Sequence, residues 1–233
     1  MKLLWQQLPT PVISELLCLN STDGVVIDTE HGCFNPETLY SCIQVITLHK
    51  KKCFIRLTEI NKTLIRTCLD AGAHGIIFST VESYEDAKKI HEYCKFPAYK
   101  GRRGLGLVRE NSWGIDENKN LVSKPPKLIA QIETEKGIDN IKDISSLNFN
   151  YYMVGPYDLS ASLGTPGDFN NSNYLDAINR IRKVIPDSKM AVHIPKNIKK
   201  ELKKYENYGM IALGMDTTFI VEKCKDIEKY VKF

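Results

Sequence analysis

The feature that most constrains the fold is a short apolar run followed by a segment of helical periodicity, a unit that recurs eight times along the chain. Apolar runs bounded by turn residues predict strands, and the apolar spacing between them predicts amphipathic helices. The expected strands are Leu3–Leu8, Gly24–Asp28, Lys52–Leu57, Gly75–Thr80, Lys127–Glu133, Tyr151–Gly155, Lys189–Ile194 and Met210–Met215. The expected helices lie near 11–19, 36–49, 61–71, 83–95, 136–147, 172–185, 196–207 and 217–231. Eight such units predict an α/β fold, a (β/α)₈ TIM barrel, and 233 residues fit a single domain over 1–233.

Local sequence supports several of the helix ends. Asn35 precedes Pro36 and Glu37, which supplies a capping side chain, a proline at the first helical position and an acid near the positive end of the dipole. Gly72 and Gly209 follow periodic segments, where the C-cap of a helix favours glycine.

One connection is much longer than a minimal unit requires. Residues 96–126 separate the fourth expected helix from the fifth expected strand and contain KGRRGLGLVRENSWG. Long loops in compact domains are usually functional or disordered, and this one carries several apolar side chains. We expect it to fold over the barrel mouth or to reach a neighbouring subunit.

Composition and charge exclude several classes of protein. The chain is 42% hydrophobic and 26% charged, which excludes a disordered, collagenous or membrane-spanning chain. The net charge of +4 is small and the lysine-rich stretches are mixed with acids, so neither nucleic acid nor a membrane is an expected partner. The seven cysteines include no C-x-x-C pair, and the opening residues do not resemble a secretory signal. A cytoplasmic location is therefore expected.

Polar side chains end several of the apolar runs. In a (β/α)₈ barrel the active site lies at the carboxyl ends of the strands, so these side chains are the candidate functional groups. Those that end the second, third, fifth and sixth runs are Asp28, Glu30, His31, Arg56, Gln131, Glu133 and Asp158. Two of the carboxylates could bind a hard divalent cation through oxygen and leave coordination sites for a substrate.

Each candidate also has a structural explanation. Asp28 could cap a loop or helix, Arg56 could form an ion pair, and Glu133 could favour the dipole of the helix that follows. His31 directly follows Asp-Thr-Glu, so both a functional and a structural role stay open for it. The other four histidines are expected to be structural or solvated. GRRGLG lacks the preceding strand and following helix of a dinucleotide-binding fingerprint. For Asp216 we expect a capping role.

Eight segments together carry a resemblance to a known family. They are LWQQLPTPVISELL, GVVIDTEHG, FIR, LIRTCLDAGAHGIIF, GRRGLG, QIETEKGIDNI, VGPYDLSASLGTPG and ALGMDT. The most specific signals are DTEH at 28–31 and GPYDLSASLG at 155–164. With these motifs the chain resembles the HpcH/HpaI family of class II pyruvate aldolases, metal-dependent (β/α)₈ enzymes that cleave 4-hydroxy-2-oxoacids. The resemblance implies an aldehyde-lyase with a divalent cofactor such as Mg²⁺, Mn²⁺ or Co²⁺. It also implies 2-oxoacid and aldehyde substrates and a homo-oligomer, with hexamers frequent in the family.

The resemblance also implies roles for individual residues. His31 matches the acid–base histidine, which is oriented by an acid that corresponds to Asp70. Arg56 matches the arginine that stabilises the enolate oxygen, and Asp28 matches the acid that positions this arginine. The metal ligands implied are Glu133 and Asp158. The implied substrate-binding residues are Trp5, Gln131, Gly155, Pro156 and Tyr157.

This chemistry is consistent with the residue types. A divalent ion acts as a Lewis acid on the keto oxygen of pyruvate, so no Schiff-base lysine is required, and Arg56 adds a fixed positive charge where the enolate forms. The chain departs from the family at 57–60 and 78–80, which border the part of the mouth that receives the aldehyde. We therefore expect the pyruvate half of the site to be retained and make no prediction for the aldehyde. Two alternatives remain: another lyase reaction on the same enolate site, such as oxaloacetate decarboxylation or thioester cleavage, and a barrel that binds a metabolite without turnover.

Overall fold

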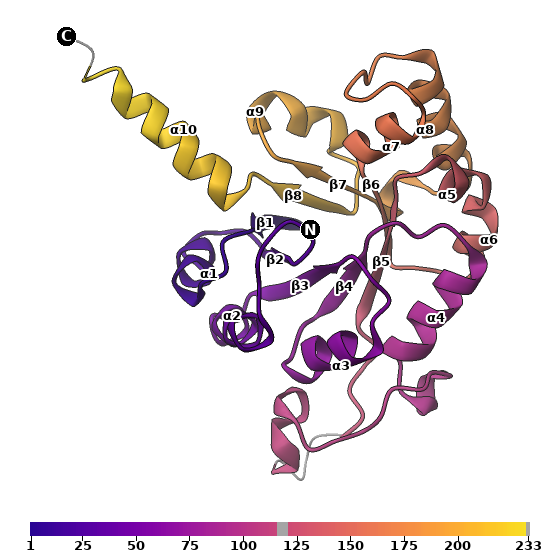
Figure 1. Cartoon of the computed structure of the whole chain (residues 1–233). Helices are drawn as coiled ribbons and strands as arrows, with labels where there is room; N and C mark the ends of the chain where they lie inside the picture. Colours follow the sequence, from indigo (N-terminus) through magenta and orange to yellow (C-terminus); the bar gives the residue numbers. More distant parts are fainter. Residues whose placement is uncertain (116–120, 232–233) are drawn as a thin grey trace.

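Eight parallel strands close into a barrel in the order in which they occur along the chain (Figure 1). The computed structural model describes residues 1–115 and 121–231. The strands are β1 (Lys2–Gln6), β2 (Gly24–Asp28), β3 (Lys52–Leu57), β4 (Gly75–Phe78), β5 (Lys127–Ile132), β6 (Tyr151–Val154), β7 (Met190–Ile194) and β8 (Met210–Leu213). Because β8 also pairs with β1, every strand has a neighbour on both sides. The predicted (β/α)₈ barrel is confirmed.

Alternation along the strands decides which side chains point into the barrel. On β2, Val26 packs in the interior, whereas Val25 and Ile27 belong to the larger core between the strands and the helices. The interior cluster consists of Leu3, Trp5, Val26, Phe54, Ile77, Ile129, Met153, Ala191, Met210 and Ala212. A polar residue two positions after one of these therefore faces the mouth at the carboxyl end.

Helices cover the outside of the barrel, and the second of them begins directly after Asn35, the predicted capping residue. They are α1 (Pro11–Cys18), α2 (Pro36–Leu48), α3 (Lys62–Asp70), α4 (Tyr84–Cys94), α5 (Glu135–Asp139), α6 (Ile141–Ser146), α7 (Pro156–Ser162), α8 (Ser172–Val184), α9 (Ile198–Glu201) and α10 (Asp216–Glu228). The Asn35 side chain accepts a hydrogen bond of 2.8 Å from the backbone N–H of Thr38, which satisfies one free donor of the first turn of α2.

Three helical segments differ from the expectation. The single helix expected at 136–147 is divided into α5 and α6. The helix α7 was not expected, and it begins directly after β6 because Gly155 is its N-cap and Pro156 suits its first position. The helix expected at 196–207 is only the short α9 followed by a 3₁₀ turn, and it begins after Asn197, whose left-handed conformation with φ of 54° precedes the first helical residue.

The described part of segment 96–126 lies at the amino-terminal end of the barrel, away from the mouth. It leaves the end of α4 and returns to Lys127, whose backbone N–H donates to His74 O, directly before β4. Arg103 and Arg109 attach it to the end of α3 through bonds of 2.7 Å to Asp70 and to Ala71 O. The expectation that it covers the mouth is therefore wrong for these residues, because a connection from a helix to a strand starts and ends at the amino end. Contact with a neighbouring subunit stays a prediction, and 116–120 lie outside the described residues.

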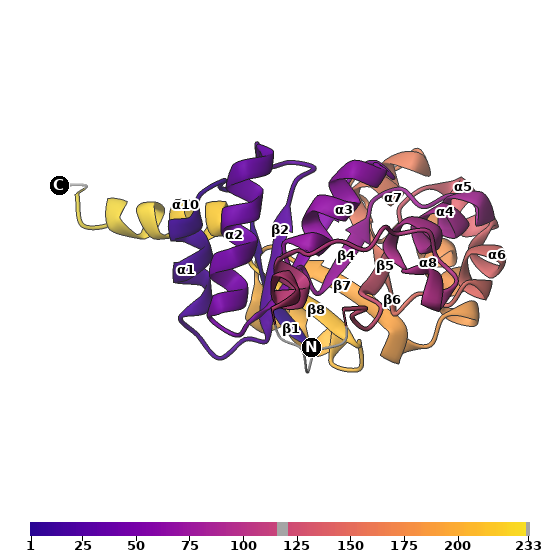
Figure 2. The ribbon, with the colours of Figure 1, turned by 90° about the horizontal axis from the view of Figure 1, so that it is seen from below.

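The last helix, α10, projects away from the barrel (Figures 1 and 2). Residues 220–231 are all exposed, including Ile220, Val221 and Ile227. The base of the helix is held by Asp216, whose buried carboxylate accepts backbone N–H bonds from Gln7 and Leu8. Among the described residues, no helix has the length and apolar character needed to cross a membrane.

Candidate active site

A cavity of about 370 Å³ opens at the carboxyl ends of the strands. It brings together most of the residues predicted to form the site. Its walls are formed by Trp5, Gln7, Asp28, His31, Arg56, Gln131, Met153, Val154, Gly155, Pro156, Tyr157, Asp158, His193, Pro195 and Met215. Of the predicted site residues, Glu133 lies directly behind the wall against Gln131, and Asp70 lies elsewhere.

Carboxylates hold the Arg56 guanidinium from two sides. Its Nε and Nη2 atoms donate to the two oxygens of Asp28 at 2.9 and 2.6 Å, and Nη1 lies 2.7 Å from Glu30 Oε2. Ser79 Oγ donates to the same oxygen of Glu30 at 2.8 Å, and the guanidinium lies over the Trp5 ring at 5.0 Å. Burial favours the neutral form of Asp28, but hydrogen bonds and charge from Arg56 outweigh it and lower the pKa of Asp28. The arginine is thus charged and fixed, with N–H groups left on both terminal nitrogens.

Aromatic rings lie beside the Arg56–Asp28 pair. Trp5 and His193 stack with ring centroids 4.2 Å apart and an angle of 10°. Trp5 Nε1 donates to Asp28 at 3.1 Å, and His193 Nε2 lies 3.0 Å from Gly214 O. Burial lowers the pKa of His193 to about 4, so the ring is neutral at neutral pH. These rings support the carboxylate that positions Arg56.

The buried carboxylate of Glu133 is held from both sides. Thr80 Oγ1 donates to Oε1 at 2.6 Å, and the Gln131 amide donates to Oε2. Burial raises the pKa of Glu133, and the charges of Glu30 and Asp158 raise it further against these hydrogen bonds. Asp158 is exposed in the first turn of α7, on the next strand unit around the barrel.

The residues around Glu133 fit a divalent cation. The Oε1 atom of Gln131 is buried and has no hydrogen-bond partner among the described residues. A Cβ atom at Gly155 would lie 2.4 Å from Glu133 Oε2, so glycine keeps this space open. The described residues contain no cluster of three or more His, Cys, Asp or Glu suited to a metal. Glu133 and Asp158 are the two carboxylates that could bind the ion, with substrate and water completing the shell.

Asp70 does not lie near His31 in this chain. It ends α3 at the amino end of the barrel, where it pairs with Arg103 at 2.7 Å. His31 follows β2 at the carboxyl end, roughly 15 Å away along the strand direction. The expectation that Asp70 orients His31 is therefore wrong within one subunit. The His31 ring lines the cavity, and its backbone N–H donates to Asp28 Oδ1 at 3.3 Å.

Sequence reasoning missed the roles of two residues. It noted Glu30 among the strand-end acids but did not assign it to Arg56, and it expected His193 to be structural. Alternation would have placed His193 at the mouth, because Ala191 two positions earlier faces the barrel interior. No comparable signal exists for the contact of Glu30 with Arg56, which depends on the loop after β2.

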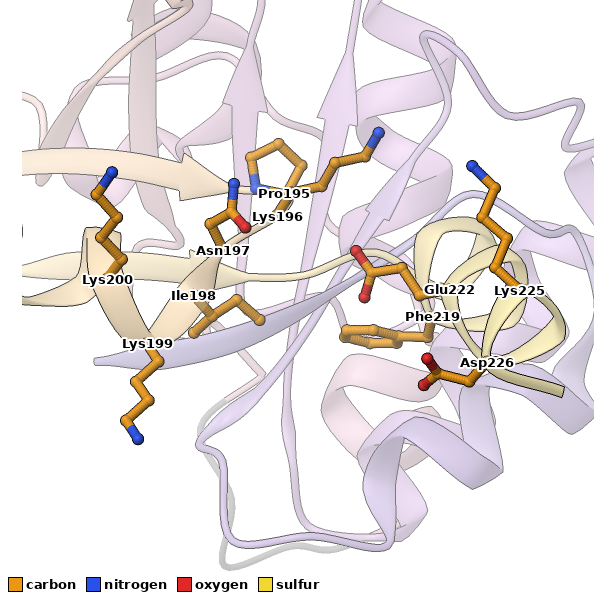
Figure 3. Close-up of a pocket in the computed structure, with 10 residues that line it drawn as sticks. All are labelled: Pro195, Lys196, Asn197, Ile198, Lys199, Lys200, Phe219, Glu222, Lys225 and Asp226. Atoms are coloured by element: carbon orange, nitrogen blue, oxygen red, sulfur yellow. The ribbon is translucent and has the colours of Figure 1, made fainter. Parts of the chain in front are cut away.

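A second groove, of about 670 Å³, lies between α9 and the projecting α10 (Figure 3). Phe219 and Ile198 approach each other at its base near Gly214, and Pro195 lines both this groove and the active-site cavity. Three lysines, Lys196, Lys199 and Lys200, lie on the α9 side, whereas α10 contributes two acids, Glu222 and Asp226, and one lysine, Lys225 (Figure 3). None of the predicted site residues lines this groove.

Comparison with known sequences identifies relatives over nearly the whole chain. The profile of the HpcH/HpaI aldolase/citrate lyase family matches residues 2–222. The 2-keto-3-deoxy-L-rhamnonate aldolase of Shigella boydii serotype 4 is 28% identical over 222 residues, covering 92% of this chain and 82% of that protein. The protein of the same name from Escherichia coli K12 is 29% identical with the same coverage.

Solved structures show the same fold. An HpcH/HpaI aldolase/citrate lyase family protein from Burkholderia cenocepacia J2315 superposes with a TM-score of 0.89 at 23% identity, covering 99% of this chain and 94% of that one. For citrate synthase SbnG the TM-score is 0.82 at 24% identity, with 99% and 92% covered. These identities support the barrel fold alone. The profile match over residues 2–222 carries the assignment further. The chain therefore belongs to the HpcH/HpaI aldolase/citrate lyase family and is a carbon–carbon lyase.

Proposed function

We propose that this chain is a divalent-metal-dependent aldolase that forms or cleaves the bond between the enolate of pyruvate and an aldehyde. Its substrates would be 4-hydroxy-2-oxoacids. The observation that carries the proposal is the convergence at one mouth of a buried, hydrogen-bonded Glu133, the neighbouring Asp158 and the doubly paired Arg56. A divalent ion bound by the two carboxylates would supply Lewis acidity toward the keto oxygen of pyruvate.

The residues around this point are suited to bind and orient pyruvate. The remaining N–H groups of Arg56 would donate to the oxygen on which negative charge develops, and Asp28 and Glu30 prevent the guanidinium from rotating away. Gly155 begins α7, so the free backbone N–H groups that follow it at the start of this helix would receive the pyruvate carboxylate. Trp5 and Gln131 close the sides of the same cavity.

His31 is the acid–base candidate. Its ring lines the cavity and is exposed, so it can exchange protons with solvent. We propose that it moves the proton between the aldol hydroxyl and water. The curated relatives named 2-keto-3-deoxy-L-rhamnonate aldolase support a substrate of this kind, because a 2-keto-3-deoxy sugar acid carries a hydroxyl at C4.

The test combines pyruvate, a panel of aldehydes and Mg²⁺, Mn²⁺ or Co²⁺, and scores 4-hydroxy-2-oxoacid products by mass spectrometry. Turnover that needs metal and is lost in Glu133→Gln supports the proposal. Turnover of oxaloacetate without any aldol product would replace it with the decarboxylase alternative. Full aldol activity in chelator would exclude the metal site.

We also propose that the chain forms a homo-oligomer, a hexamer if it follows the family resemblance. The projecting α10 exposes Ile220 and Val221, and the nearby helix α1 exposes Val12 and Leu16 (Figures 1 and 2). Two copies that exchanged α10 would bury these apolar side chains, and the acids of α10 would face the lysines of the groove in Figure 3. Light scattering after gel filtration tests this, and a monomer at micromolar concentration would exclude it.

A cytoplasmic location is the last part of the proposal. All seven cysteines are free thiols, and five of them are buried, which suits a reducing compartment. Fractionation of the source cells with an antibody to the chain would test it.

A further inference from the structure

Thr80 has an unusual backbone conformation directly beside the site. Its φ is 52°, in the left-handed region, which β-branched residues seldom adopt. The backbone is fixed on both sides of it: Ser79 N donates to Leu57 O at 3.0 Å, and Val81 N donates to Gln131 O at 3.1 Å. The surroundings therefore impose this conformation, and Thr80 is the β-branched residue among the seven described non-glycine residues with a positive φ.

The conformation directs the Thr80 hydroxyl at one carboxylate. Oγ1 donates to Glu133 Oε1 at 2.6 Å, while the Gln131 amide donates to the other oxygen. Thr80 is exposed, whereas Glu133 is only 4% exposed, so this hydrogen bond joins a residue at the surface of the mouth to a buried carboxylate. Glu133 Oε2 lies only 2.4 Å from the position that a Cβ atom at residue 155 would take, so glycine there leaves the space that the carboxylate occupies.

A carboxylate that binds a cation gains from being held in one orientation beforehand. Groups that hydrogen-bond a metal ligand typically change metal affinity about 10- to 100-fold when they are removed. Glycine or asparagine would satisfy this backbone with less strain, but neither offers a short hydroxyl at the same place. The side chain of Thr80 is thus the feature that accounts for keeping a strained residue here.

We propose that Thr80 is a positioning residue: its left-handed backbone aims the hydroxyl at Glu133 and fixes that carboxylate for a divalent cation. The inference rests on the proposed function, because Glu133 is taken as a metal ligand. It concerns a residue in the 78–80 segment, where the chain departs from its family.

Three substitutions at position 80 distinguish the effect of the hydroxyl on metal binding from the effect of the strained backbone. Thr80→Val keeps the shape and the strained backbone but removes the hydroxyl, and Thr80→Ser keeps the hydroxyl. Thr80→Gly removes both. We expect Mn²⁺ binding, measured by calorimetry without substrate, to be about 10-fold weaker for Thr80→Val and Thr80→Gly and within about 3-fold of wild type for Thr80→Ser.

Thermal stability provides a second readout, because relief of backbone strain should raise the melting temperature of a variant that binds Mn²⁺ more weakly. In chelator, Thr80→Gly should melt about 2–4 °C higher than Thr80→Val, because both variants lack the hydroxyl and only glycine relieves the left-handed strain. The matched control is Lys50→Gly, since Lys50 also has a left-handed φ, of 57°, but follows α2 at the amino end of the barrel. This control should raise the melting temperature similarly and leave the Mn²⁺ affinity unchanged.

The outcomes distinguish this inference from the proposed function. Weaker binding in Thr80→Val, with recovery in Thr80→Ser, supports the positioning role. Wild-type binding of Mn²⁺ that is lost in Glu133→Gln but unchanged in Thr80→Val overturns the inference and keeps the metal site. A wild-type protein that binds no Mn²⁺ at millimolar concentration overturns both. Equal loss in Thr80→Val and Thr80→Ser would show that any change at this turn perturbs the site, which also overturns the role of the hydroxyl.

Discussion

Replacement of Arg56 by lysine tests the central element of the proposed mechanism. The guanidinium makes three charge-assisted contacts, two with Asp28 at 2.9 and 2.6 Å and one with Glu30 at 2.7 Å. A lysine ammonium keeps the positive charge but is a point charge without the planar fork. It can pair with one carboxylate or point toward substrate, but it cannot hold both carboxylates while donating to an enolate.

The expected losses follow from these contacts. Losing one oxyanion-type donor typically lowers a rate by about 10²- to 10³-fold, so both enolate formation and aldol cleavage should fall by that factor. Asp28 is 0% exposed, so the loss of at least one charged hydrogen bond should destabilise the fold by about 2 kcal/mol. For a protein of this size that corresponds to a melting temperature lower by roughly 4–8 °C.

Two assays measure the chemical effect. Exchange of the pyruvate methyl protons with deuterated solvent, followed by NMR without aldehyde, reports enolate formation, and coupled detection of pyruvate reports cleavage. The control is Arg66→Lys on α3, because Arg66 is exposed and should leave both rates unchanged. If Arg56→Lys exchanges and cleaves at near wild-type rates, the arginine is a structural ion pair and the enolate argument is wrong.

Three further predictions concern other parts of the site. Chelator should abolish turnover and added metal restore it, while the double variant Glu133→Gln, Asp158→Asn should stay inactive in saturating Mn²⁺; activity in that variant would exclude these ligands. His31→Ala should lower cleavage about 10²- to 10⁴-fold and lower methyl exchange less, and equal losses measured side by side would show that one base serves both steps. Burial lowers the pKa of His193 to about 4, so the unfolded chain binds the extra proton first and stability should fall as the pH drops from about 6.5 toward 4. His193→Phe should flatten this part of the melting-temperature profile, and an unchanged slope would contradict the buried neutral ring.

The barrel could be predicted because periodicity is a local property. All eight predicted strands occur, and β2 and β3 match to the residue at both ends. The strands β1, β4, β5, β6 and β8 end one or two residues earlier than predicted, and β7 begins one residue later, because the residue pattern does not show where hydrogen bonding to the neighbouring strand stops. The helix α7 was missed since its seven residues, about two turns, are too few to show a helical period.

Most of the candidate site could also be predicted, since strand ends and alternation together specify which side chains reach the mouth. Asp28, Arg56 and Gln131 each lie two residues after a side chain of the barrel interior. Asp70 could not be placed this way, because it lies on a helix whose end returns to the opposite side of the barrel. The strained conformation of Thr80 was equally invisible in the sequence, because it results from bonds to two neighbouring strands.

The sequence by itself determined the number and order of the β–α units and the motifs that identify the family. It also determined, through the alternation of side chains along each strand, which strand-end residues face the mouth. These properties depend on residues a few positions apart. Only the tertiary structure decided the contacts between units: Glu30 with Arg56, Thr80 with Glu133, and Asp70 with Arg103 instead of His31. Those pairs are separated by 26 to 53 positions in the chain, and their geometry depends on how the closed barrel arranges its loops around one axis.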